Sequence, residues 1–402
     1  MTSFPGGYAL DSIAALMQRP IPVLICSAIV AALLTPLVIR GAHSLGWLAH
    51  PRSDRWHSRV VALMGGVAIV GTILLMAVGS GVWLRSPVGI PLVIGMLVLA
   101  VLGAIDDRGG VNPGPKLFIE TGVGMGIVAA GLRFGPGLPD VVSIPLTIIW
   151  IIGVTNAMNL LDNMDGLAAG TGVVVGGVVA LISIQTGDVT TALISAAVTG
   201  ACLGYLPYNY RRARVFMGDT GSLPLGFVVA TLALSAGQSA VSHSSTALWG
   251  VAVPVLLCAL PLIDTTLVTI SRLRSGRAVS QGGRDHASHR LVYLGLADTA
   301  AVLSLHLAAL SVALCAVIGT RSSESATWLG AAGVVASLAF LIWLLRIDPY
   351  THRMTVVDKA SGALAHIEPH IPQIMLRSAE HLDVPEAPEG LPRRTTLVRR
   401  AN

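Results

Sequence analysis

Long apolar runs fill most of this chain and restrict its fold more than any other feature of the sequence. There are eleven of them, at residues 21–40, 62–84, 88–105, 117–134, 142–158, 166–186, 189–206, 221–236, 246–270, 298–319 and 326–345. A helix of about 20 predominantly apolar residues crosses the hydrocarbon core of a bilayer. The alternating pattern of a transmembrane β-barrel is absent, which leaves helices as the spanning structure. The sequence therefore predicts an all-α integral membrane protein with about 11 transmembrane helices.

The composition supports the same class. Hydrophobic residues make up 53% of the 402 residues and charged residues only 12%, whereas an ordinary soluble domain carries roughly 25% charged residues. Nothing in the chain indicates nucleic-acid binding, so we expect the partners to be the membrane and small molecules.

The distribution of basic residues predicts the orientation. With the N-terminus outside, the loops 40–60, 106–116, 207–219 and 271–290 and the C-terminal tail lie inside. Of the 26 Lys and Arg residues, only Arg19, Arg85, Arg133 and Arg321 then fall outside, as the positive-inside rule requires. We expect a multi-pass plasma-membrane protein whose residues 1–346 form one transmembrane domain. Residues 347–402, charged and in part Pro-rich, are predicted to form a partly disordered cytoplasmic tail.

Three polar islands next to apolar runs are the candidate functional positions. The chain has only 21 Asp and Glu residues, and five of them lie in these islands: Asp106, Asp107, Asp162, Asp165 and Asp219. A carboxylate at the edge of the hydrocarbon layer is costly and therefore indicates function. The predicted topology places all three islands on the cytoplasmic face, where they would form one active site.

Each island suits the chemistry of cations and phosphates. The adjacent pair Asp106 and Asp107 could hold Mg²⁺ or accept a proton, although a helix end that runs into water would look the same. Asn159, Asp162 and Asp165 recur every three residues and would line one face if their helix continued. Asp219 lies among glycines before an apolar run, a pattern typical of an anion site and equally of a helix N-cap.

Basic and histidine residues in the other inner loops supply the opposite charge. They are Arg55, His57, Lys116 and a fourth island that contains His286, His289 and Arg290, all of which could hold phosphates or a sugar. Positive-inside anchoring is the alternative explanation for any single arginine. Asp264, inside the ninth apolar run, is expected to orient this loop or to pair with a basic partner.

Together the islands resemble the polyprenyl-phosphate N-acetylhexosamine-1-phosphate transferases, the membrane-embedded glycosyltransferase family 4. The resemblance covers about residues 40–300 and rests on Asp106-Asp107, the stretch Asn156 to Gly166, the stretch Asn209 to Ser222 and the histidine loop, in the family's order. It implies transfer of a sugar 1-phosphate from a UDP-sugar to undecaprenyl or decaprenyl phosphate, with release of UMP and with Mg²⁺, or Mn²⁺ in its place, as cofactor. It also implies a homodimer and the start of a lipid-linked cell-envelope glycan.

The resemblance also implies roles for single residues. Asp219 resembles the principal metal ligand, with Asn159 as a second one. Asp106 is similar to the carboxylate that activates the lipid phosphate, with Asp107 beside it and Asp162 as a further catalytic carboxylate. Direct attack by the lipid phosphate and a covalent phosphoaspartate at Asp106 both stay open. The nucleotide-contacting positions would be Asp165 and Asn209.

The fourth island departs from the family pattern. The family's loop often reads His-x-His-His or carries three consecutive histidines, whereas here it reads His286-Ala287-Ser288-His289. This difference, with the segment Asp54-Arg55-Trp56-His57, favours the GlcNAc-type branch over the alternative, a UDP-MurNAc-pentapeptide phosphotransferase.

Two alternatives from other classes predict different features. A secondary transporter would place its carboxylates near the bilayer midplane in helices related by an internal repeat, and no repeat is visible here. A lipid-scaffold protein without activity would tolerate changes in any one island.

Overall fold

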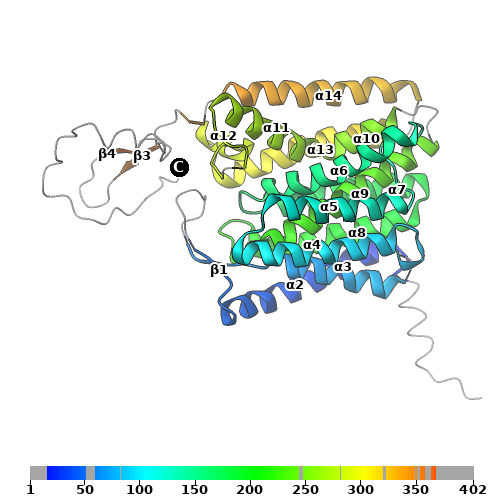
Figure 1. The fold of residues 1–402 in the computed structure, drawn as a ribbon, viewed down its shortest axis with the longest axis horizontal. Coiled ribbons are helices and arrows are strands. Elements are labelled where there is room, and N and C mark those ends of the chain that lie inside the picture. The colour runs from blue at the N-terminus through cyan, green and yellow to red at the C-terminus, as the bar shows by residue number, and fades with distance from the viewer. Residues whose placement is uncertain are drawn as a thin grey trace, which may run out of the picture.

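The protein is a bundle of helices that lie side by side, as the computed structural model in Figure 1 shows. The structure describes residues 16–50, 59–81, 83–243, 248–280, 282–319, 323–347, 349–350, 354–357 and 364–367. The helices are α2 (Pro20–Ser44), α3 (Gly66–Ser80), α4 (Gly89–Gly109), α5 (Pro113–Ala129), α6 (Asp140–Leu161), α7 (Leu167–Thr186), α8 (Val189–Asn209), α9 (Asp219–His243), α10 (Trp249–Leu257), α11 (Ala259–Arg274), α12 (Ala287–Tyr293), α13 (Asp298–Gly319) and α14 (Ser323–Leu345), with a short 3₁₀ helix at Trp83–Arg85. The prediction of a mostly helical protein is confirmed.

Every predicted apolar run contains helix, but the runs differ in length. Among the described residues, eight helices are long and apolar enough to cross a membrane, and a ninth span results if α10 and α11 count as one. With 15 and 17 residues, α3 and α5 extend about 22 and 25 Å, less than the roughly 30 Å of a hydrocarbon core. The number of eleven spans therefore stays a prediction, as does their orientation.

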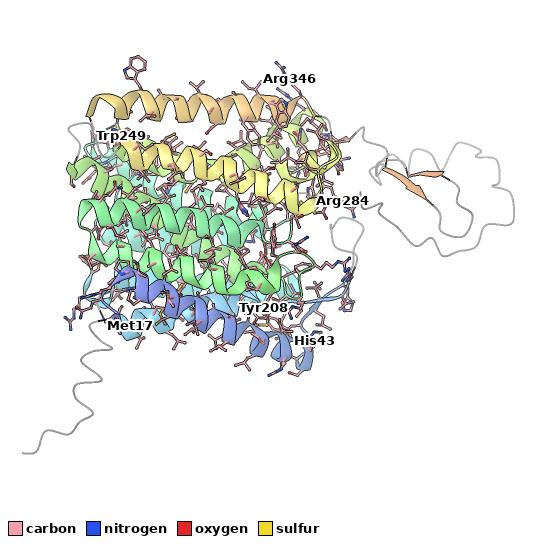
Figure 2. The ribbon with its side chains drawn as sticks, turned by 180° about the vertical axis from the view of Figure 1, so that it is seen from behind. Met17, His43, Tyr208, Trp249, Arg284 and Arg346 are labelled. Atoms are coloured by element: carbon pink, nitrogen blue, oxygen red, sulfur yellow. The ribbon has the colours of Figure 1, made fainter. Side chains whose placement is uncertain are left out.

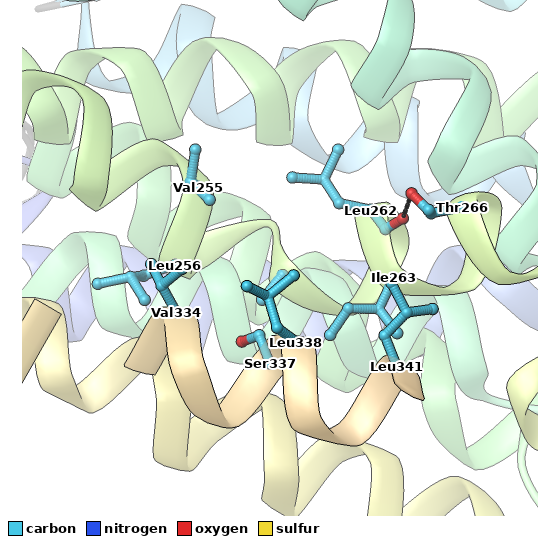
Figure 3. A pocket seen from close by; sticks show the side chains of 10 residues that line it. Val255, Leu256, Leu262, Ile263, Thr266, Val334, Ser337, Leu338 and Leu341 are labelled. Atoms are coloured by element: carbon cyan, nitrogen blue, oxygen red, sulfur yellow. Dashed lines mark hydrogen bonds between the residues drawn. The ribbon is translucent and has the colours of Figure 1, made fainter. Parts of the chain in front are cut away.

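The ninth predicted run is not one continuous helix. It breaks at Cys258 into α10 and α11, whose axes differ by 72°. Pro261 explains the break, since a proline ring has no N–H to donate and clashes with the carbonyl group four residues earlier, here that of Leu257. The bend leaves an apolar cavity of about 210 Å³ between α10, α11 and α14 (Figure 3).

The centre of the bundle consists of α7, α8 and α9. Between 67% and 78% of their apolar windows is buried, against 22% for α2 and 17% for α14 at the periphery. Apolar side chains cover the outer faces of α2 and α14, as lipid contact requires. The central helices therefore form the buried core, with the third polar island at the start of α9, and the outer helices face the bilayer.

Short extended segments tie the loops together at one end of the bundle. The strands β1 (Leu48–Ala49) and β2 (Val61–Ala62) pair in antiparallel fashion, and the loop before α9 lies beside β2 through a parallel bridge from Ala62 to Val215. Figure 2 shows Tyr208, Arg284 and Arg346 at this end, and Met17 and Trp249 at the opposite one.

The C-terminal segment contributes two more strands, β3 (Met354–Val357) and β4 (Leu364–Ile367), which pair in antiparallel fashion. Most of the predicted disordered tail, 347–402, lies outside the described residues, so that prediction stays as it is.

Candidate active site

Four helix ends bring four polar side chains together. The Nζ atom of Lys116 lies 2.9 Å from an Oδ atom of Asp106 and 3.2 Å from one of Asp219. Asn159 donates from Nδ2 to the other carboxylate oxygen of Asp219, at 2.8 Å, and to the hydroxyl oxygen of Ser222, at 2.8 Å. We call Asp106, Lys116, Asn159 and Asp219 the lysine cluster. The structure thus joins the predicted metal, catalytic and phosphate positions of three separate loops.

The cluster forms because the helix ends approach one another at backbone distance. A Cβ atom on Gly103 of α4 would lie 2.1 Å from the carbonyl oxygen of Asp219. One built on Gly66, at the start of α3, would lie 2.1 Å from the Cα atom of Gly221. Real Cβ atoms do not come this close, so these positions require glycine. The absence of two side chains therefore places the first turn of α9 directly beside the end of α4 and the start of α3.

Asp107 does not join the cluster but binds the start of α9. One of its oxygens accepts from the backbone N–H of Asp219 at 2.9 Å, and the other accepts from the N–H and the hydroxyl of Thr220 at 3.0 and 2.7 Å. The first N–H groups of a helix have no partner within the helix, and a carboxylate is the group that stabilises them best. Asp107 is therefore a helix cap supplied by another helix, and its predicted catalytic role stays a prediction.

The second island folds differently from the pattern that its spacing suggested. The expectation of one continuing helical face is wrong beyond Asn159, because α6 ends at Leu161 and the chain turns through Gly166, with φ at 78°. Asp162 caps α6, and an oxygen of Asp165 accepts from the backbone N–H groups of Arg212 and Ala213 at 3.1 and 2.8 Å. Only Asn159 of this island reaches the lysine cluster through the hydrogen bonds described above.

Asn209 is buried at the junction of two loops. Its side-chain oxygen accepts from the N–H of Gly166 at 3.0 Å, and its nitrogen donates to the carbonyl of Val215 at 2.9 Å. It is 2% exposed. The side chain thus fixes the loop that carries Asp165 against the loop before α9, and the predicted contact with a nucleoside stays a prediction.

The fourth island is a compact buried loop held by two aspartates. Asp264 of α11 accepts from the backbone N–H of Ala287 and lies 2.7 Å from Nδ1 of His286. Its side chain is 0% exposed, and the expectation that it orients this loop is confirmed. Arg272 binds both oxygens of Asp285 at 2.8 and 2.9 Å. We call residues 282–291 the histidine loop.

Arg290 does not point to an open site. It is 1% exposed, and its guanidinium group donates to the carbonyl oxygens of Asp285, Leu344 and Ile347 and to the hydroxyl of Ser271. The last carbonyl groups of a helix lack partners, and a cation stabilises that end. Arg290 therefore caps the C-terminal end of α14, and its predicted phosphate-binding role stays a prediction.

Of the remaining predicted site residues, the structure describes His286 and His289 but not Arg55 or His57. The ring of His289 lies edge-on to that of His286, with centroids 5.5 Å apart, and both histidines are buried. Arg55 and His57 lie outside the described residues. None of the predicted site residues lines the apolar cavity at the bend of α10 and α11.

Sequence reasoning missed two contacts that extend the site. Glu120, one helical turn after Lys116, is 2% exposed and accepts from Nδ2 of Asn156 at 2.7 Å. Ser288, where the family often has a histidine, donates to Oδ1 of Asn163 at 2.7 Å and so joins the histidine loop to the second island. The spacing of four residues places Glu120 on the same helical face as Lys116, and this was the available signal that Glu120 lies near the site. No signal in the sequence pairs Ser288 with Asn163.

The pKa of Asp285, which lies outside the spanning helices, is strongly shifted by its surroundings. Burial by itself raises the pKa of this carboxyl group. The hydrogen bonds from Arg272, together with the electrostatic effect of the nearby His286, outweigh the effect of burial and lower the pKa to about 2. Asp285 therefore stays ionised and forms an ion pair with Arg272.

The lysine cluster has the opposite balance. Two carboxylates share one ammonium group, and the side chains of Asp106, Lys116 and Asp219 are 16%, 15% and 30% exposed. Oxygen donors with excess negative charge are the ligands that Mg²⁺ prefers. Among the described residues no group of three His, Cys, Asp or Glu side chains could hold a metal alone. A Mg²⁺ ion fits here because it is usually bound by one or two carboxylates and completed by substrate phosphates.

Comparison with known proteins agrees with this chemistry. Residues 90–237 match the family model for glycosyl transferase family 4. A Bacillus subtilis protein named probable undecaprenyl-phosphate N-acetylglucosaminyl 1-phosphate transferase is 32% identical over 340 residues, which are 82% of this chain and 90% of the relative. A decaprenyl-phosphate N-acetylglucosaminephosphotransferase of Mycolicibacterium smegmatis is 32% identical over 76% of this chain and 83% of the relative.

The other branch matches over a shorter stretch. A phospho-N-acetylmuramoyl-pentapeptide-transferase of a Synechococcus strain is 34% identical over 53% of this chain and 66% of its own length. The family model begins in α4 and ends in α9, so it contains every member of the lysine cluster. The chain belongs to glycosyl transferase family 4, the polyprenyl-phosphate N-acetylhexosamine-1-phosphate transferases that its polar islands resemble.

Proposed function

We propose that this protein transfers GlcNAc-1-phosphate from UDP-GlcNAc to a polyprenyl phosphate in the membrane and releases UMP. The observation that carries the proposal is the bridge from Lys116 to both Asp106 and Asp219, at a point where four apolar helices end. Such a site can bind two phosphorylated substrates, one embedded in the bilayer and one dissolved in water. The GlcNAc-type relatives, which match over more than three quarters of the chain, support this sugar over the muramoyl-pentapeptide.

The reaction exchanges one phosphoanhydride bond for another. An oxygen of the lipid phosphate attacks the phosphorus that carries the sugar, a new P–O–P linkage forms, and the bond to the UMP oxygen breaks. The attacking and leaving groups are already anions, so the protein mainly has to position them and to offset their charge. Direct attack requires no covalent intermediate on Asp106.

Each member of the lysine cluster has a task in this scheme. Lys116 would exchange one of its two carboxylate partners for a phosphate oxygen and hold the substrates by charge. Asp106 would keep the lipid phosphate deprotonated. Mg²⁺, held by Asp219 with Asn159 beside it, would supply further positive charge for the diphosphate. Asp165 and the nearby Asn209 would contact the nucleotide, and Asp162 would be a further catalytic carboxylate in the same loop.

The histidine loop closes the site from another side. His286 and His289 would contact the sugar phosphate, with His286 oriented by Asp264. Arg55 and His57 stay candidates for the same task. We place the site on the cytoplasmic face of the plasma membrane, because UDP-sugars are cytoplasmic and the basic loops are predicted to lie there. A homodimer stays part of the proposal by analogy with the family.

The test is a panel of nucleotide sugars offered to the purified protein with one polyprenyl phosphate. We expect UMP release and a lipid-linked GlcNAc phosphate, detected by mass, with UDP-GlcNAc only when polyprenyl phosphate and Mg²⁺ or Mn²⁺ are both present. Chelation with EDTA should stop the reaction, and added Mg²⁺ should restore it.

The same panel decides between the alternatives. Product from UDP-MurNAc-pentapeptide alone would assign the protein to the other branch. Transport of a solute into proteoliposomes without UMP release would favour a secondary transporter, and no activity of either kind would favour a scaffold.

A further inference from the structure

The last helix and the residues after it are attached to the histidine loop by several hydrogen bonds. Arg290 of the loop donates to the carbonyl oxygens of Leu344 and Ile347 at the end of α14. Tyr350, five residues beyond that end, donates its hydroxyl to Oδ2 of Asp285 at 2.8 Å. Figures 1 and 2 show the end of α14 at the same end of the bundle as this loop.

Tyr350 is held in place from both sides. The guanidinium carbon of Arg277 lies 4.2 Å from the centre of its ring, a distance typical of a cation–π contact. Burial and the adjacent Asp285 carboxylate raise the pKa of Tyr350 above its ordinary value, so the phenol keeps the proton that it donates. Arg277 follows α11 in the chain, so a residue beyond the last helix bridges two segments of the site.

The contacts continue from Asp285 toward the reacting groups. Asp285 precedes His286, whose ring is fixed by Asp264 at 2.7 Å. Two residues further, Ser288 donates to Asn163 of the second island at 2.7 Å. The position of the loop backbone at Asp285 therefore affects where His286 lies and where Ser288 meets the second island.

We propose that Tyr350 is a positioning residue of the active site, which together with the end of α14 holds the histidine loop in its working geometry. This inference rests on the proposed function in that the histidines are taken to contact the substrate. It makes the short segment after the last helix part of the enzyme and not merely the start of a tail. Its effect passes through Asp285, because that carboxylate is the group to which the hydroxyl binds.

The first test measures the loop itself, without substrate. In the Tyr350→Phe variant the ring remains under Arg277 and only the hydroxyl is lost. We expect backbone hydrogen exchange in residues 282–291 of the full-length protein to become faster by about tenfold, which corresponds to about 1.4 kcal/mol of local opening. Unchanged exchange in this segment would overturn the proposal.

Tyr208→Phe is the matched control for this test. Tyr208 also lies beneath an arginine, Arg214, and also donates its hydroxyl to the protein, to the carbonyl of Ala32 at 2.9 Å. Its removal should leave exchange in the histidine loop unchanged. An equal increase in both variants would show a general loosening and would also overturn the proposal.

The second test is kinetic. We expect Tyr350→Phe to lower kcat about tenfold with little change in KM for polyprenyl phosphate, since small misplacements of positioned groups act on the chemical step. Combined with Asp285→Asn, it should add almost nothing to the loss caused by Asp285→Asn alone. Additive losses would contradict an action through Asp285.

Shortened chains separate Tyr350 from the rest of the C-terminal segment. A chain that ends after residue 353 should keep wild-type kcat, whereas a chain that ends after residue 347 should match or exceed the loss in Tyr350→Phe. Equal activity of the two would overturn the proposal. If the wild-type protein itself turned over no UDP-sugar, the proposed function would fail, and the exchange experiment would still decide on the loop.

Discussion

The lysine cluster and the histidine loop are both rich in charged side chains, yet they differ in how fully those charges are paired and buried. In the lysine cluster two carboxylates share one ammonium group, and the three side chains are partly open to solvent. At the histidine loop, Asp264 and Arg272 of α11 and Asp285 of the loop itself are at most 3% exposed, and each is fully engaged by side chains or backbone of the same protein.

This difference in pairing and burial distinguishes a site that can bind a ligand from a loop whose charges stabilise the fold. A buried charge that has good partners holds a structure and becomes costly only when one partner is removed. A charge cluster with an excess of one sign at a solvent-accessible position can still gain by binding a ligand of opposite sign. We therefore expect changes in the lysine cluster to affect turnover first, and changes in the histidine loop to affect stability first.

Asp219→Asn should give the largest effect. We expect turnover to fall about a thousandfold, because the variant loses the carboxylate that we propose to hold Mg²⁺ beside the reacting phosphates, and loss of a preorganised electrostatic group has effects of this size. The thermal unfolding temperature in detergent should change little. Asp140→Asn, at an exposed position at the start of α6, is the control. Full turnover in a folded Asp219→Asn protein would show that the lysine cluster is not part of the active site.

Arg290→Met should act mainly on stability. Its loss leaves the carbonyl groups at the end of α14 and the hydroxyl of Ser271 without their buried partner. We expect a loss of about 3 kcal/mol in unfolding free energy, measured by thermal or denaturant unfolding in detergent. Arg274→Met, at an exposed position of α11, should cost little. A stable Arg290→Met protein with weakened UDP-sugar binding would instead support the predicted phosphate contact.

Asp107→Ala tests whether the two neighbouring aspartates differ. Removal of a helix cap costs about 1 kcal/mol, so we expect a modest drop in unfolding temperature and a smaller loss of turnover than in Asp106→Asn. The two variants should be compared in the same membrane preparation. If Asp107→Ala unfolded like the wild type and lost turnover as completely as Asp106→Asn, Asp107 would be a catalytic carboxylate.

The smallest effect concerns pH. The pKa of Asp285 is lowered in the folded protein from 3.8 to about 2, so its contribution to stability is fully present above pH 4 and is lost as the pH falls through about 2. The difference in unfolding temperature between wild type and Asp285→Asn should therefore be constant from pH 8 to pH 4 and shrink below. A difference that already shrinks at pH 6 would show that another group controls the loop.

The sequence predicted the class of fold and the members of the site better than their contacts. Apolar length alone predicted the helices, since each run in a bilayer must satisfy its backbone internally. The lysine cluster followed from residue type and order. The break at Cys258 was missed, because the apolar run continues across it and only Pro261 signals it. The spacing of Asn159, Asp162 and Asp165 suggested one helical face, because sequence spacing does not reveal where a helix ends.

Caps between helices were the least predictable feature. In the sequence Asp107 looks like a catalytic carboxylate and Arg290 like a phosphate ligand, since a charged side chain at a helix end or in a loop is typical of binding as well as of capping. The helix ends that they cap are supplied by backbone groups more than 50 residues away. Only the packing of α4 against α9, and of α12 near the end of α14, decides between capping and binding.

The contact of Gly66 with Gly221, and of Gly103 with Asp219, has a consequence for how this enzyme can vary. These main chains meet with no room for a methyl group, so the spacing of the site cannot be tuned by exchanging one small side chain for another. In a survey of all single substitutions, positions without any functional group should be as intolerant as the aspartates themselves. Substitutions that change substrate preference during evolution would then occur in the loops, while the residues at the helix ends stay unchanged.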